Sequence, residues 1–287
     1  MLLRLVLIIL SLHCVAYGDE QPLRLRFGVY QSDRATVMYR KFTPILEAIQ
    51  DPLEQLIKQP VDIHLTIFEN YDAGIKALVD GDVDFVRFGP ASYIIAQQQN
   101  ENISLLVMEQ QKGLSRFNGF IVAKADAGIT TLEDLRGKSF AFGNQNSTIG
   151  RFLAQAEMLK VGITAEDLKS HNFLGRHDLV AKAVISGTHD AGALKESTYK
   201  KLCDPKKIII VHSFENVTKP WVAREGLEQP IKNAITEALL SLYKPKVLEE
   251  LGCTGFVNAI PSDYDTVRAS MKKAKSFVPK KKKITSE

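Results

Sequence analysis

Two segments of the chain repeat one pattern of residues, and this repeat constrains the fold more than any other feature. They are GIKALVDGDVDFVRFGPASY (74–93) and VAKAVISGTHDAGALKESTY (180–199), which align without a gap and are identical at five of twenty positions. Both are typical of a helix, a glycine turn, a short strand and the start of a second helix. Because the order of elements matches as well as the residues, we interpret the repeat as two similar α/β lobes.

The rest of the sequence continues this alternation. Strands are expected at 23–30, 61–68, 84–88, 120–123, 139–142, 171–174, 190–194 and 208–211. One or two helices are expected over 35–57, and others at 73–79, from Pro90 onward, at 132–135, 147–159, 179–186, 197–202 and from 227 onward. This order predicts mostly parallel sheets with helices on both faces. We expect residues 19–115 plus 214–275 to form a first, discontinuous lobe and 116–213 a second. Ligands bind at the carboxyl ends of such strands, so the cleft between the lobes is the expected site.

The N-terminus predicts export. Arg4 precedes an apolar run at 5–12, interrupted by Ser11, and Ala16 and Gly18 stand at positions suited to cleavage. We therefore expect residues 1–18 to be a secretory signal peptide. No later segment approaches the ~20 apolar residues that span a bilayer.

The net charge of +4 comes from the C-terminus, where residues 269–287 hold seven lysines against one glutamate. A nucleic-acid surface would spread its cations over folded elements, so no nucleic acid is expected. We expect 276–287 to be a disordered, solvated tail, with anionic lipid or a protein partner as the alternatives. Beyond the leader, Cys203 and Cys253 permit one disulfide without requiring it. No zinc-ligand spacing occurs, and no metal site is expected.

Residues 143–150 (GNQNSTIG) lie between an expected strand and a helix. Ser147 and Thr148 place hydroxyl groups beside the unpaired N–H groups of that helix start, an arrangement that favours a tetrahedral oxyanion. A plain N-cap is the alternative. The spacing of a P-loop is absent.

Three further residues lie at strand ends or helix starts. His177 can donate to a phosphoryl oxygen, although an exposed loop histidine is more often inert. Tyr71 and Tyr93 can turn their phenols toward the cleft, although a tyrosine more often packs with its hydroxyl in water.

Several motifs occur in a fixed order: Gly89-Pro90-x-Ser92-Tyr93, TLEDLRGKSFAFG (131–143), Ser147-Thr148 with Gly150, and His177 spaced before Ala183-Val184, Gly187 and Asp190-Ala191. From residue 23 to about 275 the chain resembles the periplasmic phosphate, phosphite and phosphonate binding proteins of ABC transporters. The resemblance implies a two-lobed type II binding-protein fold of the α/β class. It implies that the oxyanion is contacted by Tyr71, Tyr93, Ser147, Thr148 and His177.

The chain departs from the family pattern at the site. Ile149 stands where the family has a serine, so an apolar side chain replaces one hydroxyl donor. Lys219 stands near the place of a carboxylate that receives the amine of an aminophosphonate, and it disfavours 2-aminoethylphosphonate. Glu196, near the second carboxylate position, keeps that ligand open. Phe117 replaces an aromatic residue that usually carries a hydroxyl.

The resemblance implies capture of phosphate, phosphite or a simple phosphonate in the periplasm, without a cofactor, for an ABC permease in the inner membrane. We expect a monomer. The altered motif at Ile149 and the lysine tail also fit an alternative, a ligand-sensing subunit that reports to a membrane receptor. An enzyme is not expected, because the sequence has no nucleophile elbow, metalloprotease or dinucleotide motif. Ser147 and His177 lack a third group to orient them as a catalytic dyad.

Overall fold

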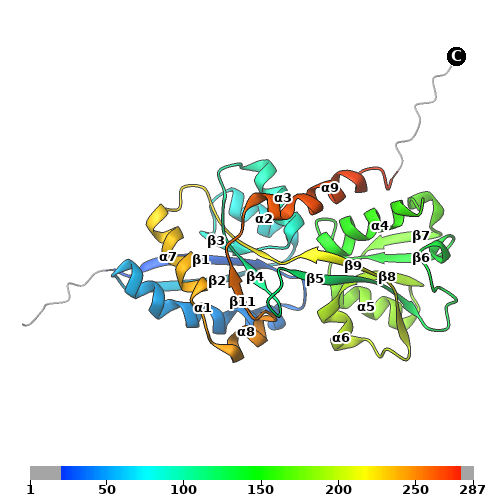
Figure 1. Cartoon of the computed structure of the whole chain (residues 1–287), viewed down its shortest axis with the longest axis horizontal. Coiled ribbons are helices and arrows are strands. Elements are labelled where there is room, and N and C mark those ends of the chain that lie inside the picture. The colour runs from blue at the N-terminus through cyan, green and yellow to red at the C-terminus, as the bar shows by residue number, and fades with distance from the viewer. Residues whose placement is uncertain (1–20, 279–287) are drawn as a thin grey trace, which may run out of the picture.

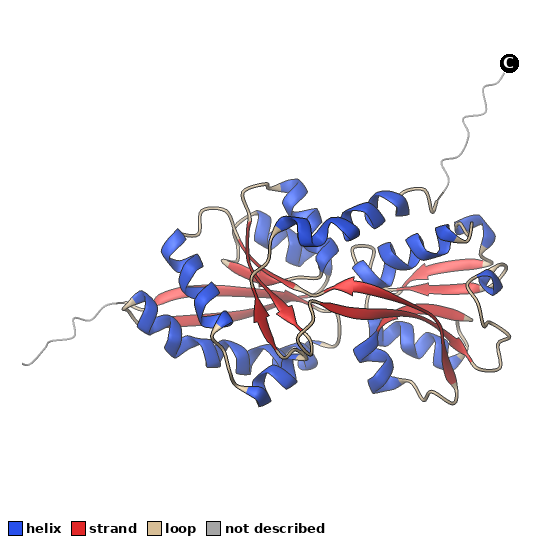
Figure 2. Ribbon diagram, in the orientation of Figure 1, coloured by secondary structure: helices blue, strands red, loops and turns tan. Residues whose placement is uncertain are grey.

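The computed structural model describes residues 21–278, which form two α/β lobes, each built on its own sheet (Figure 1). The expected signal peptide and residues 279–287 of the expected tail lie outside this range. Figure 2 shows helices packed on both faces of each sheet. The expected two-lobed α/β architecture is confirmed.

The first sheet has six strands in the spatial order β11-β4-β10-β3-β1-β2. β1 (Leu23–Tyr30) is parallel to β2 (Val61–Phe68) and to β3 (Phe85–Arg87). β10 (Pro220–Ala223) is antiparallel to β3 and to β4 (Ser104–Gln110), and β11 (Gly255–Val257) is antiparallel to β4. The helices around this sheet are α1 (Ala35–Ile57), α2 (Tyr71–Val79), α3 (Pro90–Gln99), α7 (Gln229–Leu240), α8 (Pro245–Leu251) and α9 (Asp265–Ala274).

The second sheet has five strands in the order β7-β6-β8-β5-β9. β6 (Ser139–Phe142) is parallel to β7 (Ser170–Phe173) and β8 (Ala191–Lys195), and β5 (Arg116–Lys124) is antiparallel to β8 and to β9 (Ile208–Val217). The helices are α4 (Ala154–Lys160), α5 (His177–Ser186) and α6 (Glu196–Leu202), and a π-helical segment, η2 (Thr148–Leu153), leads into α4. Short 3₁₀ turns cover Glu133–Leu135, Ala165–Asp167 and Pro261–Tyr264.

Both sheets are mixed, whereas the alternation of elements predicted mostly parallel ones. In each sheet three parallel strands at one edge adjoin antiparallel strands. β4, β10 and β11 were not among the expected strands. All four residues of β10 are buried and β11 has only three residues, so neither shows the apolar and polar alternation that predicts a strand.

The repeated segments occupy equivalent places in the two sheets. The first covers most of α2, then β3 and the start of α3, and the second covers most of α5, then β8 and the start of α6. β3 lies between β1 and β10, and β8 lies between β6 and β5. The glycine after each helix, Gly81 (φ 80°) or Gly187 (φ 76°), has the left-handed conformation that glycine adopts without strain. The two lobes therefore share one local design.

Two strand connections cross between the lobes, from β4 to β5 and from β9 back to β10, and they lie side by side (Figure 1). Thr218 N–H donates to Ser115 O at 3.0 Å across this crossover. α9 also joins the lobes: Val267 and Met271 pack in the first lobe, and Phe277 just beyond is fully buried in the core of the second. The folded chain thus includes Phe277, although the expected tail begins at residue 276.

Candidate functional site

A small pocket lies between the lobes, at the ends of strands and the starts of helices. Its volume is about 50 Å³. This is far below the roughly 300–1,000 Å³ of pockets that hold larger organic ligands, so the pocket suits a small ion such as a tetrahedral oxyanion. We call it the oxyanion pocket. Its lining residues are Tyr30, Ser32, Tyr71, Arg87, Gly89, Pro90, Phe117, Ser147, Thr148, Ile149, His177, Lys195, Asn216 and Lys219.

The first lobe contributes two stacked tyrosines, Tyr30 and Tyr71, with ring centroids 3.8 Å apart. Tyr71 is the first residue of α2, which begins there because the Asn70 side chain accepts the Ala73 N–H at 2.9 Å. Burial, and then Tyr30, raise the pKa of Tyr71 well above its ordinary value, so its hydroxyl stays a donor. Tyr30 was not expected here. Its hydroxyl accepts the N–H of Gly89 at 2.7 Å, which holds the start of α3 at the pocket.

Tyr93 does not line the oxyanion pocket. Its ring is 1% exposed and packs edge-on against Tyr264 at 5.1 Å, on the core side of α3. The neighbouring Ser92 faces Tyr30 instead, and the two hydroxyl oxygens lie 2.9 Å apart. Adjacent helix residues point in directions about 100° apart, so the sequence pattern alone did not reveal which side chain of the Ser92-Tyr93 pair faces the cleft.

The second lobe contributes Ser147, Thr148 and Ile149 from the turn after β6. The Ser147 hydroxyl accepts Gly150 N–H at 2.9 Å, so this residue is an N-cap and also lines the pocket. The first N–H groups of a helix have no partner within it and carry partial positive charge, so the start of η2 favours an anion. Ile149 is 4% exposed and packs into the core of the lobe, so it gives the pocket an apolar wall.

Gly150 lets the start of η2 approach the backbone of the preceding turn. A Cβ at Gly150 would lie 2.8 Å from Gly143 Cα, and the Gly143 N–H donates to Gly150 O at 2.8 Å. We predict that Gly150→Ala lowers the free energy of unfolding by about 1–3 kcal/mol, because backbone atoms cannot yield as a flexible side chain does. Urea denaturation measures this change. A variant as stable as the parent would show that the two segments separate freely.

The structure is in a closed form, with several contacts between the lobes. Ala91 N–H donates to Thr148 Oγ1 at 2.9 Å, Asn146 Nδ2 donates to Asp72 Oδ1 at 2.6 Å, and Lys195 Nζ donates to Asp33 Oδ2 at 2.6 Å. Thr148 therefore touches both the pocket and the opposite lobe.

His177 begins α5 and is 5% exposed. Its Nδ1 is buried without a hydrogen-bond partner. Burial, and then the charge of Lys195, lower the pKa of His177 to about 3, so the ring is neutral near pH 7. A neutral ring still offers one N–H donor to a ligand.

This low pKa predicts a loss of stability in mild acid. Below its ordinary pKa of about 6.5, His177 takes up a proton in the unfolded chain but not in the folded one. Stability is therefore lost as the pH falls from about 6.5 toward 3, and His177 accounts for up to about 2 kcal/mol of this loss by pH 5. Chemical denaturation at pH 7 and pH 5 checks this: His177→Gln should reduce the loss, whereas His64→Gln, on the exposed side of β2, should not. Equal losses in all three proteins would contradict the prediction.

Three cations at the oxyanion pocket, Arg87, Lys195 and Lys219, were not expected as ligand residues. Arg87 Nε and Nη2 donate to the two carboxylate oxygens of Glu109 at 2.7 and 3.1 Å, and Lys219 Nζ lies 3.4 Å from the same carboxylate. Glu109 is fully buried. Burial would raise the pKa of Glu109, but Arg87 and Lys219 hold it below its ordinary value. Burial lowers the pKa of Lys219 to about 7, against the attraction of Glu109.

The sequence carried a signal for one of these cations. In the repeat, Lys195 aligns with Gly89, and each is the N-cap residue of the helix that follows, α6 or α3. Both line the oxyanion pocket. The repeat gives no such signal for Arg87 or Lys219, and the family resemblance marked only Lys219 as a residue near the site.

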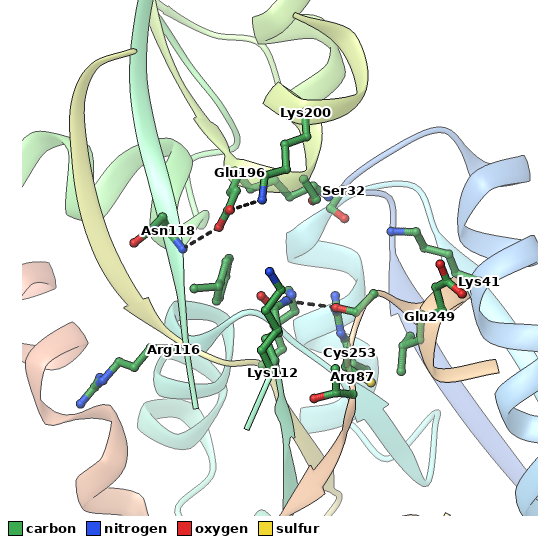
Figure 3. A pocket seen from close by; sticks show the side chains of 18 of the residues that line it. Ser32, Lys41, Arg87, Lys112, Arg116, Asn118, Glu196, Lys200, Glu249 and Cys253 are labelled. Atoms are coloured by element: carbon green, nitrogen blue, oxygen red, sulfur yellow. Dashed lines mark hydrogen bonds and ion pairs between the residues drawn. The ribbon is translucent and has the colours of Figure 1, made fainter. Parts of the chain in front are cut away.

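A larger cavity of about 470 Å³ adjoins the oxyanion pocket and shares five of its lining residues, Ser32, Arg87, Phe117, Lys195 and Lys219 (Figure 3). We call it the outer cavity. Glu196 lines it, ion-paired to Lys200 and accepting the Asn118 N–H at 3.4 Å. Lys219 Nζ lies over the ring of Phe117, 4.3 Å from the ring centroid, in a cation–π contact.

Among residues 21–278, no cluster of three or more His, Cys, Asp or Glu side chains is suited to a metal ion. Cys203 and Cys253 are free thiols buried in different lobes. Within the same range no helix has the length and apolarity needed to cross a bilayer.

Comparison with known proteins matches the chain to a family. Residues 27–264 match the family described as the periplasmic substrate-binding protein of phosphonate ABC transporters. The chain is 24% identical over 270 residues to a probable ABC-transporter phosphite-binding protein of Prochlorococcus marinus, covering 86% of this chain and 89% of the relative. It is 26% identical over 255 residues to a phosphate-import protein of Mycolicibacterium smegmatis, covering 78% and 79%. The Prochlorococcus protein PhnD1, solved with methylphosphonate, superposes with a TM-score of 0.78 at 22% identity, covering 89% of this chain and 99% of that one.

Proposed function

Because the chain belongs to the family of periplasmic substrate-binding proteins of phosphonate ABC transporters, we propose that it captures a small phosphorus oxyanion between its lobes for uptake. The observation that carries the proposal is the oxyanion pocket, where donors from both lobes surround a volume of about 50 Å³. The two relatives described above are named for phosphite binding and phosphate import, which supports this ligand class. The alternative of a sensing subunit is not favoured by these matches.

The proposed contacts come from both lobes. The Tyr71 hydroxyl and the start of α3 face the ligand from the first lobe. Ser147, Thr148 and His177 face it from the second, with Ile149 as an apolar wall. Arg87, Lys195 and Lys219 supply positive charge, which strengthens hydrogen bonds to an oxyanion. The binding residues extend the set expected from sequence and omit Tyr93.

Ligand binding by both lobes explains how capture leads to delivery. A ligand that contacts both lobes binds the closed form more tightly than the open form. The difference between these two binding free energies sets how far the ligand shifts the protein toward the closed form. We propose that an inner-membrane ABC permease recognises the closed protein, which acts as a monomer. We also propose that residues 1–18 direct export to the periplasm.

A ligand screen on the mature protein tests the function. After removal of any bound ligand by unfolding and refolding, phosphate, phosphite, methylphosphonate, 2-aminoethylphosphonate and sulfate are compared by thermal shift and calorimetry. A ligand at a hundredfold above its Kd should stabilise the protein by about 2.7 kcal/mol. We expect at least one phosphorus oxyanion to do so. We also expect 2-aminoethylphosphonate to bind less well than methylphosphonate, because Lys195 and Lys219 repel its ammonium group. A lack of response to every phosphorus oxyanion would rule out the proposed function.

A further inference from the structure

The outer cavity exceeds the needs of an inorganic oxyanion. Its volume of about 470 Å³ lies in the range of pockets that hold organic ligands, about 300–1,000 Å³. It adjoins the oxyanion pocket, and Arg87, Lys195 and Lys219 line both. A ligand whose phosphorus group sits in the oxyanion pocket can therefore extend into the outer cavity without another entrance.

Among the described cations that line the outer cavity, Lys41, Lys112 and Arg116 make no ion pair, and only Lys41 of these three is half-buried. Lys41 reaches from α1 toward the cavity (Figure 3) and lines it, but it does not line the oxyanion pocket. It is half-buried and makes no ion pair or hydrogen bond with any residue in the range 21–278. Burial, and then Lys195, lower its pKa to about 8, so Lys41 is mainly a cation near pH 7.

The charges near Lys41 are unequal. Burial would raise the pKa of Asp33, but its ion pair with Lys195 and, more weakly, the charge of Lys41 hold it at about 2. Arg87, Lys219 and Lys41 remain, and the buried carboxylate among them is Glu109. Glu109 offsets one of these three positive charges and a singly charged oxyanion beside Arg87 and Lys219 offsets a second, which leaves one positive charge unbalanced, with Lys41 the cation that has no ion-pair partner. Because Lys41 is half-buried, water solvates its ammonium group incompletely, and a ligand that brings a negative group to it gains a charge-assisted hydrogen bond.

The carboxylates of the outer cavity do not offer an amine-binding site. Glu196 forms an ion pair with Lys200 and accepts a hydrogen bond from Asn118 N–H. Asp33 forms an ion pair with Lys195. Glu215 and Glu249 also line the cavity but are exposed. Between the cations, the walls include four apolar side chains that suit a short carbon chain: Met38, Phe42, Phe117 and Leu251.

We propose that the preferred ligand is an organic phosphonate with a second anionic group, such as a carboxylate, at the far end of a short carbon chain. Its phosphonate occupies the oxyanion pocket, its carbon chain lies against Phe117 and Phe42, and its carboxylate pairs with Lys41. This inference rests on the proposed function and names the substrate class of the same site.

Calorimetry with matched ligands tests the inference. Phosphonoacetate and 3-phosphonopropionate are each compared with the corresponding carboxamide, which has nearly the same shape but no charge, and methylphosphonate serves as the reference. For at least one chain length we expect the carboxylate to bind about tenfold or more tightly than the amide, the effect of one charge-assisted hydrogen bond.

Two variants locate the second anion. Lys41→Met should abolish most of the preference for carboxylate over amide, and should leave the Kd for methylphosphonate within about twofold. Lys112→Met is the matched control, because Lys112 lines the same cavity but is exposed, and it should keep the preference. Since Lys41 has no partner among the described residues, its replacement is expected to leave the fold intact, which a thermal melt verifies.

The possible outcomes separate the two proposals. Equal binding of carboxylate and amide, or a preference that survives in Lys41→Met, overturns the second-anion inference while methylphosphonate binding still supports the proposed function. A lack of binding by every phosphonate and by phosphate overturns both. A preference that Lys41→Met abolishes and Lys112→Met retains supports the inference.

Discussion

Replacing Thr148 with valine should lower the affinity for phosphorus oxyanions by about 100-fold or more. The Thr148 hydroxyl accepts the N–H of Ala91 across the cleft at 2.9 Å, which leaves its own hydrogen free to donate into the oxyanion pocket. Valine keeps the shape but removes a hydrogen bond to a charged ligand, worth about 1.5–3 kcal/mol. It also leaves the Ala91 N–H unpaired in the closed form, at a further cost of about 1–3 kcal/mol. A combined loss of about 2.7 kcal/mol corresponds to 100-fold.

Titration calorimetry with the tightest ligand of the screen measures this effect. Thr43→Val is the matched control, because the Thr43 hydroxyl is also buried but has no hydrogen-bond partner. It should bind the ligand as the parent does. A Thr148→Val protein that folds and keeps full affinity would mean that the ligand binds elsewhere or that closure does not involve this contact.

Replacing Glu109 with glutamine should destabilise the ligand-free protein more than any other single change in the cleft. Glu109 is fully buried and pairs with both Arg87 and Lys219. Removing one partner of a buried ion pair costs about 3–5 kcal/mol, because the remaining charge is left without compensation. Arg87 and Lys219 would then lie buried beside an uncharged amide. For a chain of this size we expect a fall in Tm of roughly 10 °C.

The oxyanion should restore part of this loss, which distinguishes the effect from ordinary damage to the core. A bound oxyanion supplies negative charge to Arg87 and Lys219, so Glu109→Gln should show a larger thermal shift with ligand than the parent protein does. Glu249→Gln is the control, since it removes the same charge from an exposed position in the outer cavity. It should change neither the Tm nor the ligand shift. A destabilised Glu109→Gln protein with an unchanged ligand shift would mean that the two cations do not contact the ligand.

The sequence by itself determined the features that depend on neighbours in the chain. The periodicity of apolar residues predicted β1, α1, β2 and β6 with the bounds that the structure has. The repeat predicted two lobes, and the two repeated segments occupy equivalent positions in the two sheets. The turn before η2 predicted hydroxyl groups at a helix start, and Ser147 caps that helix. These features form over a few residues, so a local pattern is enough to reveal them.

Only the tertiary structure decided which distant residues meet. Glu109 meets Arg87 from 22 residues away and Lys219 from 110 residues away, on β4, β3 and the return crossover. Tyr30 rather than Tyr93 lines the oxyanion pocket because β1 ends there while Tyr93 faces the core of its lobe. The antiparallel strands β10 and β11 join their sheet by long-range pairing, with little local pattern of their own. Contacts of this kind arise from the packing of whole elements, and no short stretch of sequence encodes them.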